Sequence, residues 1–456
     1  MTAAAVPTDT IEVRDPSTGD VIGTIPAGDT ATVDAAVTAA RAAWPAWART
    51  PPAERGERLK AVARMLPAAR VELAELQSRD CGKPCGDSCG GVDAGIGAIE
   101  QYAELGPLHR GHSLQGSPFA HDAMIREPRG VVAILVPWNA PVAVAAGQLA
   151  AALAAGNAVV FKPSERTPLC SARLAELFRV ELPDGVLEVV VGDARAGRPL
   201  VAHPGVDVVL HTGSVTTGRE IARVCGERGA KALLELGGKD PLVVDADVDP
   251  VWAAQQAAAG AFANAGQLCT SVERIYVHAA IAAPFVAALA DAARTYEIGP
   301  LIDRRQRSAV HGHVAAAVEQ GARALVGGDI PEGPGCFYPP TVLVDVTDDM
   351  AVMRDETFGP VAPVRIVASF DEALALASAT EIYGLAASVL TASQIHAARA
   401  CRELRAGTVK VNAVFGGAPG GAAQPQRLSG TGFGYGPELL DELTFTKVVH
   451  VSAAGA

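Results

Sequence analysis

Apolar and polar positions alternate along the chain in a way that predicts an α/β protein. Short apolar runs at 131–136, 158–161, 187–191 and 206–210 are separated by helical patterns, one of them at 142–155. A second alternating series starts near 241 and extends to about 411. Because strands that alternate with helices build βαβ units, we expect parallel sheets.

The two ends of the chain follow other patterns. Residues 11–24 predict short strands around a turn, and apolar residues spaced by three and four predict helices at 32–48 and 52–79. The polar stretch 103–127 predicts an extended excursion from the main body, and 445–451 predicts a last strand.

One uncharged segment, from Gly130 to Phe161, is long enough to span a bilayer. Polar and helix-breaking residues interrupt it, among them Pro137, Asn139 and Gly156. Its two β-rich ends flank an Ala-rich middle, which favours strand, turn, helix and strand inside an α/β core. We therefore expect no membrane span.

Size and composition narrow the class of protein. A chain of 456 residues exceeds the size of one hydrophobic core, which predicts two or three domains. The net charge of −12, with scattered basic residues, gives no electrostatic footprint for nucleic acid. The start of the chain lacks secretory features and the eight Cys have no small-scaffold density, so we expect reduced thiols in the cytoplasm.

Cys269 and Glu235 are the first candidates for chemistry, and they lie 34 residues apart. A thiol can attack a carbonyl, and a carboxylate can activate the water that later releases the product. The apolar neighbours Leu234 and Leu236 argue for burial of Glu235, which would raise its pKa. The alternatives are a small buried thiol and a solvated carboxylate.

Several further motifs occur in order and point to one family. They are Val136-Pro137-Trp138-Asn139-Ala140-Pro141, Phe161-Lys162-Pro163-Ser164-Glu165, Thr212-Gly213-Ser214, the segments around Glu235 and Cys269, Glu356-Thr357-Phe358-Gly359-Pro360, and Tyr383-Gly384-Leu385. Together they resemble the NAD(P)-dependent aldehyde dehydrogenase superfamily over nearly the whole chain.

The resemblance assigns a covalent mechanism to three residues. The thiolate of Cys269 would attack the aldehyde carbon, and the Asn139 amide would stabilise the oxyanion together with the backbone N–H of Cys269. Hydride transfer to nicotinamide would leave a thioester, which water activated by Glu235 would hydrolyse. Without the resemblance, Asn139 is simply a turn residue between two prolines.

The cofactor motif differs from a Rossmann fingerprint, since no G-x-G-x-x-G follows a first strand. The glycine cluster at 430–436 lies near the C-terminus and is predicted to be an irregular loop. The resemblance instead places the pyrophosphate at the helix start after Gly213 and Ser214. The cofactor-binding residues that it implies are Val136, Pro137, Trp138, Lys162, Ser164, Glu165, Gly213, Ser214, Leu236, Gly237, Glu356 and Phe358.

The carboxylate of Glu165 favours NAD, because it would repel a 2′-phosphate on the adenosine ribose. NADP is the alternative, with Lys162 and Ser164 as phosphate ligands. Glu356 and Phe358 match residues that hold the nicotinamide ribose and ring, and on their own they would be a buried turn before a strand.

The resemblance also implies an aldehyde-dehydrogenase-like architecture of two parallel-sheet α/β domains plus a small β arm. A Rossmann-like cofactor domain would comprise 1–110 and 129–237, and a catalytic domain 238–436. Residues 111–128 and 437–456 would form an oligomerisation element that pairs with a neighbouring subunit, giving a homodimer or homotetramer.

Two other motifs were weighed for chemistry. Cys81, Cys85 and Cys89 recur on one face of a predicted helix, but metal sites use two-residue gaps and a fourth ligand, so we expect no metal. The segment 86–91 resembles a serine-protease nucleophile motif, but Cys89 interrupts it and the all-β patterning of that class is missing.

Departures from the family pattern concern the substrate. Ala140 and Gly147 stand where the family has aromatic residues, Gln148 replaces a lysine, and the anchor loop at 422–430 keeps only Ser429 and Gly430. These differences predict a wide tunnel for a bulky aldehyde. The alternatives are a coenzyme-A-acylating enzyme, which the presence of Glu235 argues against, and a catalytically idle structural relative.

Overall fold

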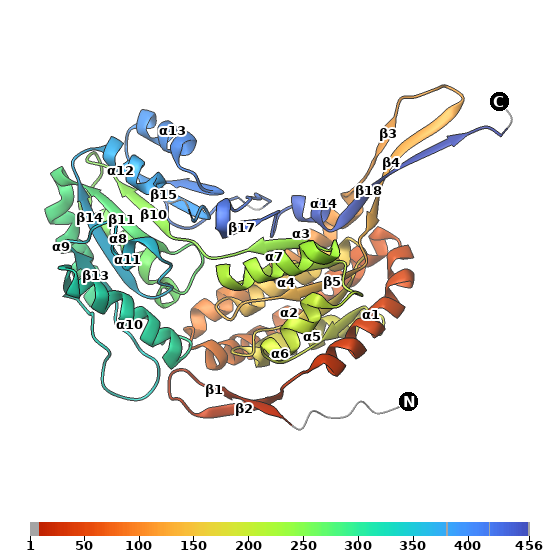
Figure 1. The fold of residues 1–456 in the computed structure, drawn as a ribbon, viewed down its shortest axis with the longest axis horizontal. Coiled ribbons are helices and arrows are strands. Elements are labelled where there is room, and N and C mark those ends of the chain that lie inside the picture. Colours follow the sequence, from red (N-terminus) through yellow and green to blue (C-terminus); the bar gives the residue numbers. More distant parts are fainter. Residues whose placement is uncertain (1–8, 380–381, 419, 455–456) are drawn as a thin grey trace.

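The computed structural model describes residues 9–379, 382–418 and 420–454, and it has two α/β lobes and a projecting β arm (Figure 1). The predicted range 1–110 starts before the first described residue, and the predicted range 437–456 ends after the last one. The first sheet has the order β17-β9-β8-β5-β6-β7. Its strands are β5 (Val131–Leu135), β6 (Ala158–Lys162), β7 (Leu187–Val189), β8 (Val208–Thr212), β9 (Lys231–Glu235) and β17 (Gly430–Thr431).

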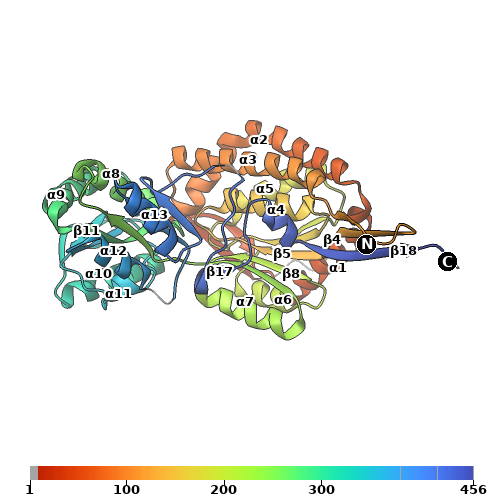
Figure 2. The same cartoon turned by 90° about the horizontal axis from the view of Figure 1, so that it is seen from above.

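The first sheet is parallel except for β17, which pairs antiparallel with β9. Strands β5 and β6 are buried throughout, which explains their continuous apolar runs. Helices cover both faces (Figure 2). One layer has α2 (Pro52–Cys81), α3 (Cys85–Leu108), α4 (Pro141–Ala154) and α5 (Pro168–Glu181); the other has α1 (Thr30–Arg49), α6 (Ala194–Ala202) and α7 (Val215–Arg228).

The second sheet has the order β12-β13-β14-β11-β10-β15-β16 and is parallel except for β12. Its strands are β10 (Asp240–Val244), β11 (Val272–His278), β12 (Arg323–Val326), β13 (Thr341–Val344), β14 (Val361–Val367), β15 (Ala386–Leu390) and β16 (Thr408–Val411). Its helices are α8 (Pro250–Phe262), η1 (Ala263–Gly266), α9 (Ala279–Thr295), α10 (Arg304–Glu319), α11 (Ala351–Arg354), α12 (Phe370–Ser378) and α13 (Gln394–Glu403). Two apolar clusters pack α8 and α9 on one face, and α10, α12 and α13 on the other.

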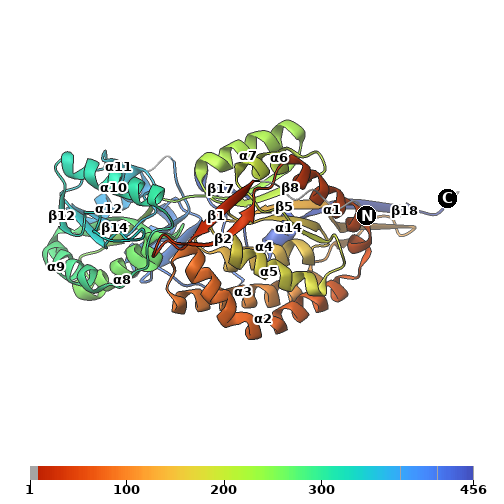
Figure 3. The ribbon, with the colours of Figure 1, turned by 90° about the horizontal axis from the view of Figure 1, so that it is seen from below.

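Two small β elements complete the fold. A three-stranded sheet of β3 (His112–Leu114), β4 (Ala120–Pro128) and β18 (Thr444–Ser452) projects from the body, next to α14 (Glu438–Glu442) (Figure 1). The hairpin of β1 (Thr10–Arg14) and β2 (Val21–Pro26) lies beside both lobes (Figure 3). The Pro16 carbonyl accepts from the Cys336 N–H at 2.8 Å, and the Gly28 N–H donates to Val191 at 3.0 Å. The hairpin segment therefore ties the lobes together.

The structure confirms the predicted α/β fold class, most strands and helices, and the last strand, with ends shifted by a few residues. The prediction that 103–127 forms an extended excursion was wrong at its start, because helix α3 continues to Leu108. Placing three cysteines on one helix was also wrong. Cys81 ends α2, where Gly82 adopts the left-handed conformation at φ 74°, and Cys85 and Cys89 belong to α3.

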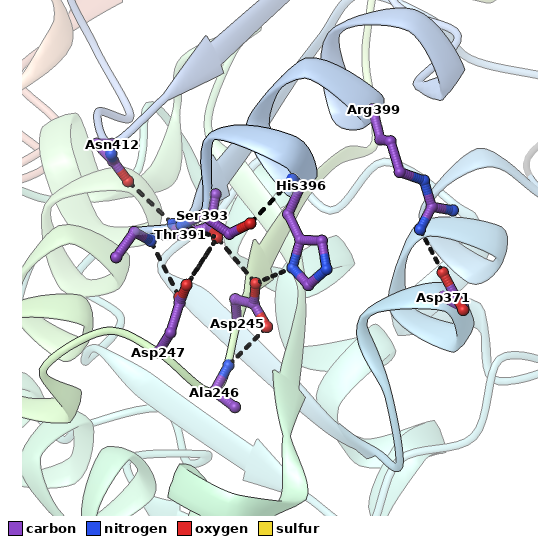
Figure 4. A network of polar contacts seen from close by, with 10 residues as sticks. Asp245, Ala246, Asp247, Asp371, Thr391, Ser393, His396, Arg399 and Asn412 are labelled. Atoms are coloured by element: carbon purple, nitrogen blue, oxygen red, sulfur yellow. Dashed lines mark hydrogen bonds and ion pairs between the residues drawn. The ribbon is translucent and has the colours of Figure 1, made fainter.

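A polar network joins the end of β10 to the end of β15 and the start of α13 (Figure 4). The Asp245 carboxylate accepts from the Thr391 hydroxyl at 2.8 Å and lies 2.5 Å from Nδ1 of His396. Asp247 accepts from the Ala392 N–H at 3.0 Å. Asp245 is buried, so the network supplies hydrogen bonds that water would otherwise provide.

We expect Asp245→Ala to lower the free energy of unfolding by about 2–3 kcal/mol, because three polar partners, Ala246, Thr391 and His396, lose a buried acceptor. The control is Asp371→Ala, which removes the exposed carboxylate partner of Arg399 and should change it by at most about 0.5 kcal/mol. Urea denaturation measures both. Equal effects would contradict a structural role for the network.

Candidate active site

The first sheet has a point where its strand order reverses, and two of the predicted motifs lie there. Strand β5 lies between β6 and β8, so the chain leaves it towards one side and later returns to the other. Parallel α/β sheets bind ligands at the carboxyl ends of the strands beside such a point. Residues 136–139 follow β5 and residues 212–214 start at the last residue of β8, so the fold brings these motifs to one edge.

Cys269 is positioned by a sharp turn between α8 and β11. Asn264 and Ala265 have φ values of 51° and 55°, and Gly266 follows at 70°. A Cβ at Gly266 would lie 2.1 Å from the Gly359 carbonyl oxygen, so only glycine fits this close approach. The turn ends the helix and leaves Cys269 in a loop with an exposed side chain.

The Asn139 side chain lies against the loop that carries Cys269. Its amide Nδ2 donates to the Gln267 carbonyl oxygen at 2.8 Å, and Asn139 is buried. Gln267 is itself held, because its side-chain oxygen accepts from the Ile302 N–H at 2.9 Å and its amide donates to Pro300 at 3.3 Å. An amide nitrogen carries two N–H groups, so one remains for a substrate oxygen.

The charges around the Cys269 thiol oppose its ionisation. Burial, followed by the carboxyl groups of Asp240, Glu235 and Glu356, raises the pKa of the thiol to about 12. Cys269 is exposed as a residue, while protein atoms surround its sulfur closely enough to disfavour the thiolate. At neutral pH the free protein therefore holds a protonated thiol, and attack on a carbonyl requires a proton acceptor.

Glu235 is the last residue of β9 and has the environment expected from its apolar flanks. Burial raises the pKa of its carboxyl to about 8, and a hydrogen bond from the Gly434 N–H opposes that rise. The Gly434 nitrogen lies 3.0 Å from Oε1 of Glu235. A carboxyl group with a pKa near the working pH can both accept and return a proton.

A buried ion pair that the sequence reasoning missed supports Phe358. Lys239 Nζ lies 2.6 Å from the Glu273 carboxylate, and both side chains are buried. Glu273 accepts from the N–H groups of Thr357 at 2.8 Å and Phe358 at 2.9 Å. One signal was present in the sequence, because the pair has the separation of 34 residues that also divides Glu235 from Cys269.

Glu356 is held against the chain crossing between the sheets. Its carboxylate accepts from the Gly238 N–H at 3.2 Å, and burial raises the pKa of the Glu356 carboxyl, with the charge of Glu273 acting in the same direction. A Cβ at Gly237 would lie 2.2 Å from the carboxylate, so this approach requires glycine. The structure therefore brings Glu356 next to Gly237 and the neighbouring Leu236.

The residues after β6 form a polar group with spare donors. Lys162 is buried, donates to the Pro163 carbonyl at 3.1 Å and lies 3.9 Å from the Glu165 carboxylate. Burial lowers the pKa of the Lys162 ammonium. An ammonium has three N–H donors, so this group fits ribose hydroxyls. Ser164 accepts from the Arg166 N–H at 3.2 Å beside it.

The start of α7 has the form of an anion site. Ser214 is the N-cap, with its hydroxyl accepting from the Thr217 N–H at 3.3 Å, and Gly213 precedes it. A Cβ at Gly218 would lie 2.4 Å from the Leu236 side chain, so glycine lets the helix approach β9 closely. The free N–H groups and dipole of a helix start favour phosphate oxygens.

Rings from the two lobes meet at the site. Trp138 and Phe358 make an edge-to-face contact with centroids 5.4 Å apart. The Val136 N–H donates to the Lys162 carbonyl at 3.3 Å, which fixes the strand end just before Pro137. The sequence-predicted cofactor residues therefore come from the first sheet, from its crossing to the second sheet, and from the loop before β14.

The structure places three of the residues that depart from the family pattern, Gln148, Gly147 and Ala140. The Gln148 amide donates to the Thr212 hydroxyl at 2.8 Å, which links α4 to the end of β8. A Cβ at Gly147 would contact Ala98 on α3 at 3.6 Å, so a larger residue meets that helix. Ala140 is half-buried next to Asn139.

The described residues contain neither a cluster of metal ligands nor a membrane-spanning helix. Within 9–379, 382–418 and 420–454, no three His, Cys, Asp or Glu side chains are grouped so that they could hold a metal ion. In the same ranges, no helix combines the length and the apolar character needed to cross a bilayer.

Comparison with known proteins agrees with this geometry. Residues 3–449 match the model of the aldehyde dehydrogenase family. The 3,6-anhydro-alpha-L-galactose dehydrogenase of Streptomyces coelicolor is 38% identical over 98% of this chain and 94% of its own length. The solved structure of betaine aldehyde dehydrogenase from Staphylococcus aureus in complex with NAD⁺ is 30% identical, with a TM-score of 0.95 over 98% of this chain and 93% of that one.

Lactaldehyde dehydrogenase from Escherichia coli gives the same picture, at 33% identity and a TM-score of 0.95, with 98% of this chain and 96% of that chain covered. The family model and these relatives match nearly the whole length of this chain. The chain belongs to the aldehyde dehydrogenase family, whose members oxidise aldehydes with NAD(P).

Proposed function

We propose that Cys269, Asn139 and Glu235 carry out the oxidation of an aldehyde to its carboxylic acid in this chain. The contact that carries the proposal is the bond from the Asn139 amide to the Gln267 carbonyl, two residues before Cys269. It holds an oxyanion donor beside a nucleophile, and a carboxyl group with a pKa of about 8 interacts with that nucleophile.

The three residues divide the reaction between them. The sulfur of Cys269 forms a bond to the aldehyde carbon while its proton passes to solvent water, and Asn139 donates to the oxygen that becomes negative. The nicotinamide cofactor, when bound, takes up the hydride from that carbon. Glu235 then removes a proton from water, the water oxygen attacks the thioester carbon, and Cys269 leaves and recovers a proton.

Cofactor binding is assigned to the lobe built on the first sheet, within the proposed ranges 1–110 and 129–237. The spare donors of Lys162 and the helix start at Ser214 support this assignment. The Glu165 carboxylate favours NAD over NADP, since it would repel a 2′-phosphate. The proposed catalytic range 238–436 supplies Cys269. It also supplies Glu356 and Phe358, which are assigned to the nicotinamide ribose and ring.

The β arm is proposed as the oligomerisation element, with a homodimer or homotetramer as the assembly and the cytoplasm as the compartment. Its strands carry exposed apolar residues, including Phe445, Val448 and Val451. Exposed strands with apolar side chains pair readily with another sheet. The arm comprises the proposed ranges 111–128 and 437–456.

A bulky aldehyde is the proposed substrate class. Ala140 directly follows Asn139, and its methyl group is much smaller than the aromatic ring that the family pattern has at this position. The sugar-derived and betaine aldehydes in the names of the relatives are larger than acetaldehyde. Which of these shapes fits best is a matter for a substrate panel graded by size.

We expect Cys269→Ala to abolish NADH formation with every aldehyde tested, whereas Glu235→Gln should keep the first turnover. Loss of a general base should slow later turnovers by about 10²-fold or more, because the thioester accumulates. Stopped-flow absorbance of NADH measures both phases. A missing burst in Glu235→Gln, or a rate that depends on coenzyme A, would contradict hydrolysis by Glu235.

The steady-state rate should rise with pH through about 8 and then level off, because Glu235 acts as a base only when it is deprotonated. Below that pKa its carboxyl is mostly protonated, so hydrolysis slows as the pH falls. A pH series of kcat with one saturating aldehyde measures this, and Glu235→Gln should lose the inflection. A profile that is flat between pH 6 and 9 is incompatible with this assignment.

Ala140→Phe should lower kcat/KM for large aldehydes by about tenfold or more and leave acetaldehyde within about threefold, because the ring would fill the space next to Asn139. Kinetics with aldehydes graded by size measure the ratio. Equal losses on both would contradict a widened tunnel.

A further inference from the structure

The glycine-rich segment 430–436, predicted from sequence to be an irregular loop, lies against the strand that ends in Glu235. Gly430 pairs with Glu235 and Thr431 pairs with Leu234 in the antiparallel contact of β17 with β9. The chain then turns back, so that Gly434 reaches the Glu235 side chain. The segment therefore contacts both the backbone and the carboxyl group of this residue.

The contact at Gly434 leaves no space for a side chain. Its N–H donates to Oε1 of Glu235 at 3.0 Å. A Cβ at this position would lie 2.1 Å from Cγ and 2.5 Å from Oε1 of Glu235, which is shorter than any real contact of a Cβ atom. Gly434 does not have a positive φ, so its backbone would accept alanine, and the three nearest atoms that a Cβ would meet all belong to Glu235.

Both ends of the segment are fixed by hydrogen bonds. Ser429 accepts from the Leu236 N–H at 2.8 Å through its carbonyl, and its hydroxyl donates to the Gly237 carbonyl at 2.8 Å. At the other end, the Tyr102 hydroxyl donates to the Gly436 carbonyl at 3.1 Å, from the buried side of α3. Gly434 is therefore held in place by contacts on either side of it.

We propose that 430–436 is a positioning element for the water-activating carboxylate, and that Gly434 is its positioning residue. This inference rests on the proposed function, in which Glu235 activates water. The backbone N–H holds one oxygen of the carboxyl group in a fixed direction, so that the other oxygen is available to water at the thioester. Glycine is required because the carboxylate occupies the position of a side chain.

The same contact favours the charged form of Glu235. A backbone N–H stabilises a carboxylate, while burial favours the neutral acid, and these effects oppose each other at this residue. Two other titratable groups interact with Glu235, the thiol of Cys269 and the phenol of Tyr435, and ionisation of either would add negative charge. The Gly434 N–H therefore stabilises the Glu235 carboxylate, whereas the ionised forms of Cys269 and Tyr435 would destabilise it.

The test is Gly434→Ala in the full-length protein, with Gly421→Ala as the matched control. Gly421 belongs to the same C-terminal stretch, and a Cβ there meets nothing closer than 3.4 Å. Gly434→Ala should lower steady-state kcat by about 10- to 100-fold and keep the rate of the NADH burst within about twofold. The control should keep both rates. Equal loss of burst and turnover, or parental turnover, would overturn the proposal.

A double variant separates positioning from general damage. When Glu235→Gln is already present, adding Gly434→Ala should lower kcat by less than about threefold, because both changes affect the same step. A full additional loss would overturn the proposal. If Gly434→Ala does not fold, Tyr102→Phe loosens the same segment and should slow turnover while keeping the burst; parental turnover in that variant would overturn it.

Glu235→Gln alone distinguishes a failure of the proposed role of Glu235 from a failure of the positioning role of Gly434. If that variant turns over normally, the proposed function of Glu235 fails, whatever Gly434→Ala does. If Glu235→Gln is slow after a burst and Gly434→Ala behaves like the parent protein, only the positioning role fails.

Discussion

The buried ion pair between Lys239 and Glu273 is the interaction on which the site depends. Lys239 lies four residues after Glu235, and Glu273 lies four residues after Cys269. The pair lies where β10 and β11 start side by side in the second sheet. A fixed contact between these starts therefore also limits the separation of the base and the nucleophile just before them.

Burial of two charges is costly, and the surrounding bonds show how the cost is offset. Lys239 also donates to the Thr357 hydroxyl at 3.1 Å, and Glu273 accepts two backbone N–H groups from the 357–358 turn. Breaking such a buried pair by removing one partner typically costs about 3–5 kcal/mol. The same bonds hold Phe358, which has a φ of 51°, against Trp138 of the other lobe. One cluster thus sets the nucleophile loop, the base and the ring contact between the lobes.

Features set by local patterns could be predicted from the sequence, whereas features set by contacts between distant residues could not. The apolar runs of strands β5 and β6 were predictable because both faces are buried, and the α4 helix was predictable from the Ala-rich stretch between the two β-rich ends. Cys269, Glu235 and Asn139 were predicted as catalytic residues from motifs that resemble the family, and these roles stay predictions. Gln267, Glu273 and Gly434 were missed, since each acts through a partner that is distant in sequence or through a backbone group. The break between Cys81 and Cys85 was missed because Gly82 and Pro84 outweighed a regular cysteine spacing.

The electrostatics of the site favour a mechanism in which the thiolate never exists alone. Burial raises the pKa of both Glu235 and Glu356, so at neutral pH these carboxyl groups are mostly uncharged. Uncharged groups repel the negative charge that develops during attack less than two carboxylates would. The Cys269 thiol still has a pKa of about 12, so complete loss of its proton before attack is unfavourable at neutral pH. Attack can proceed if bond formation and proton loss occur together, because the charge then passes directly to the aldehyde oxygen. In the proposed mechanism the Asn139 amide, held at the Gln267 carbonyl, donates to that oxygen, which would compensate for an environment that disfavours the thiolate.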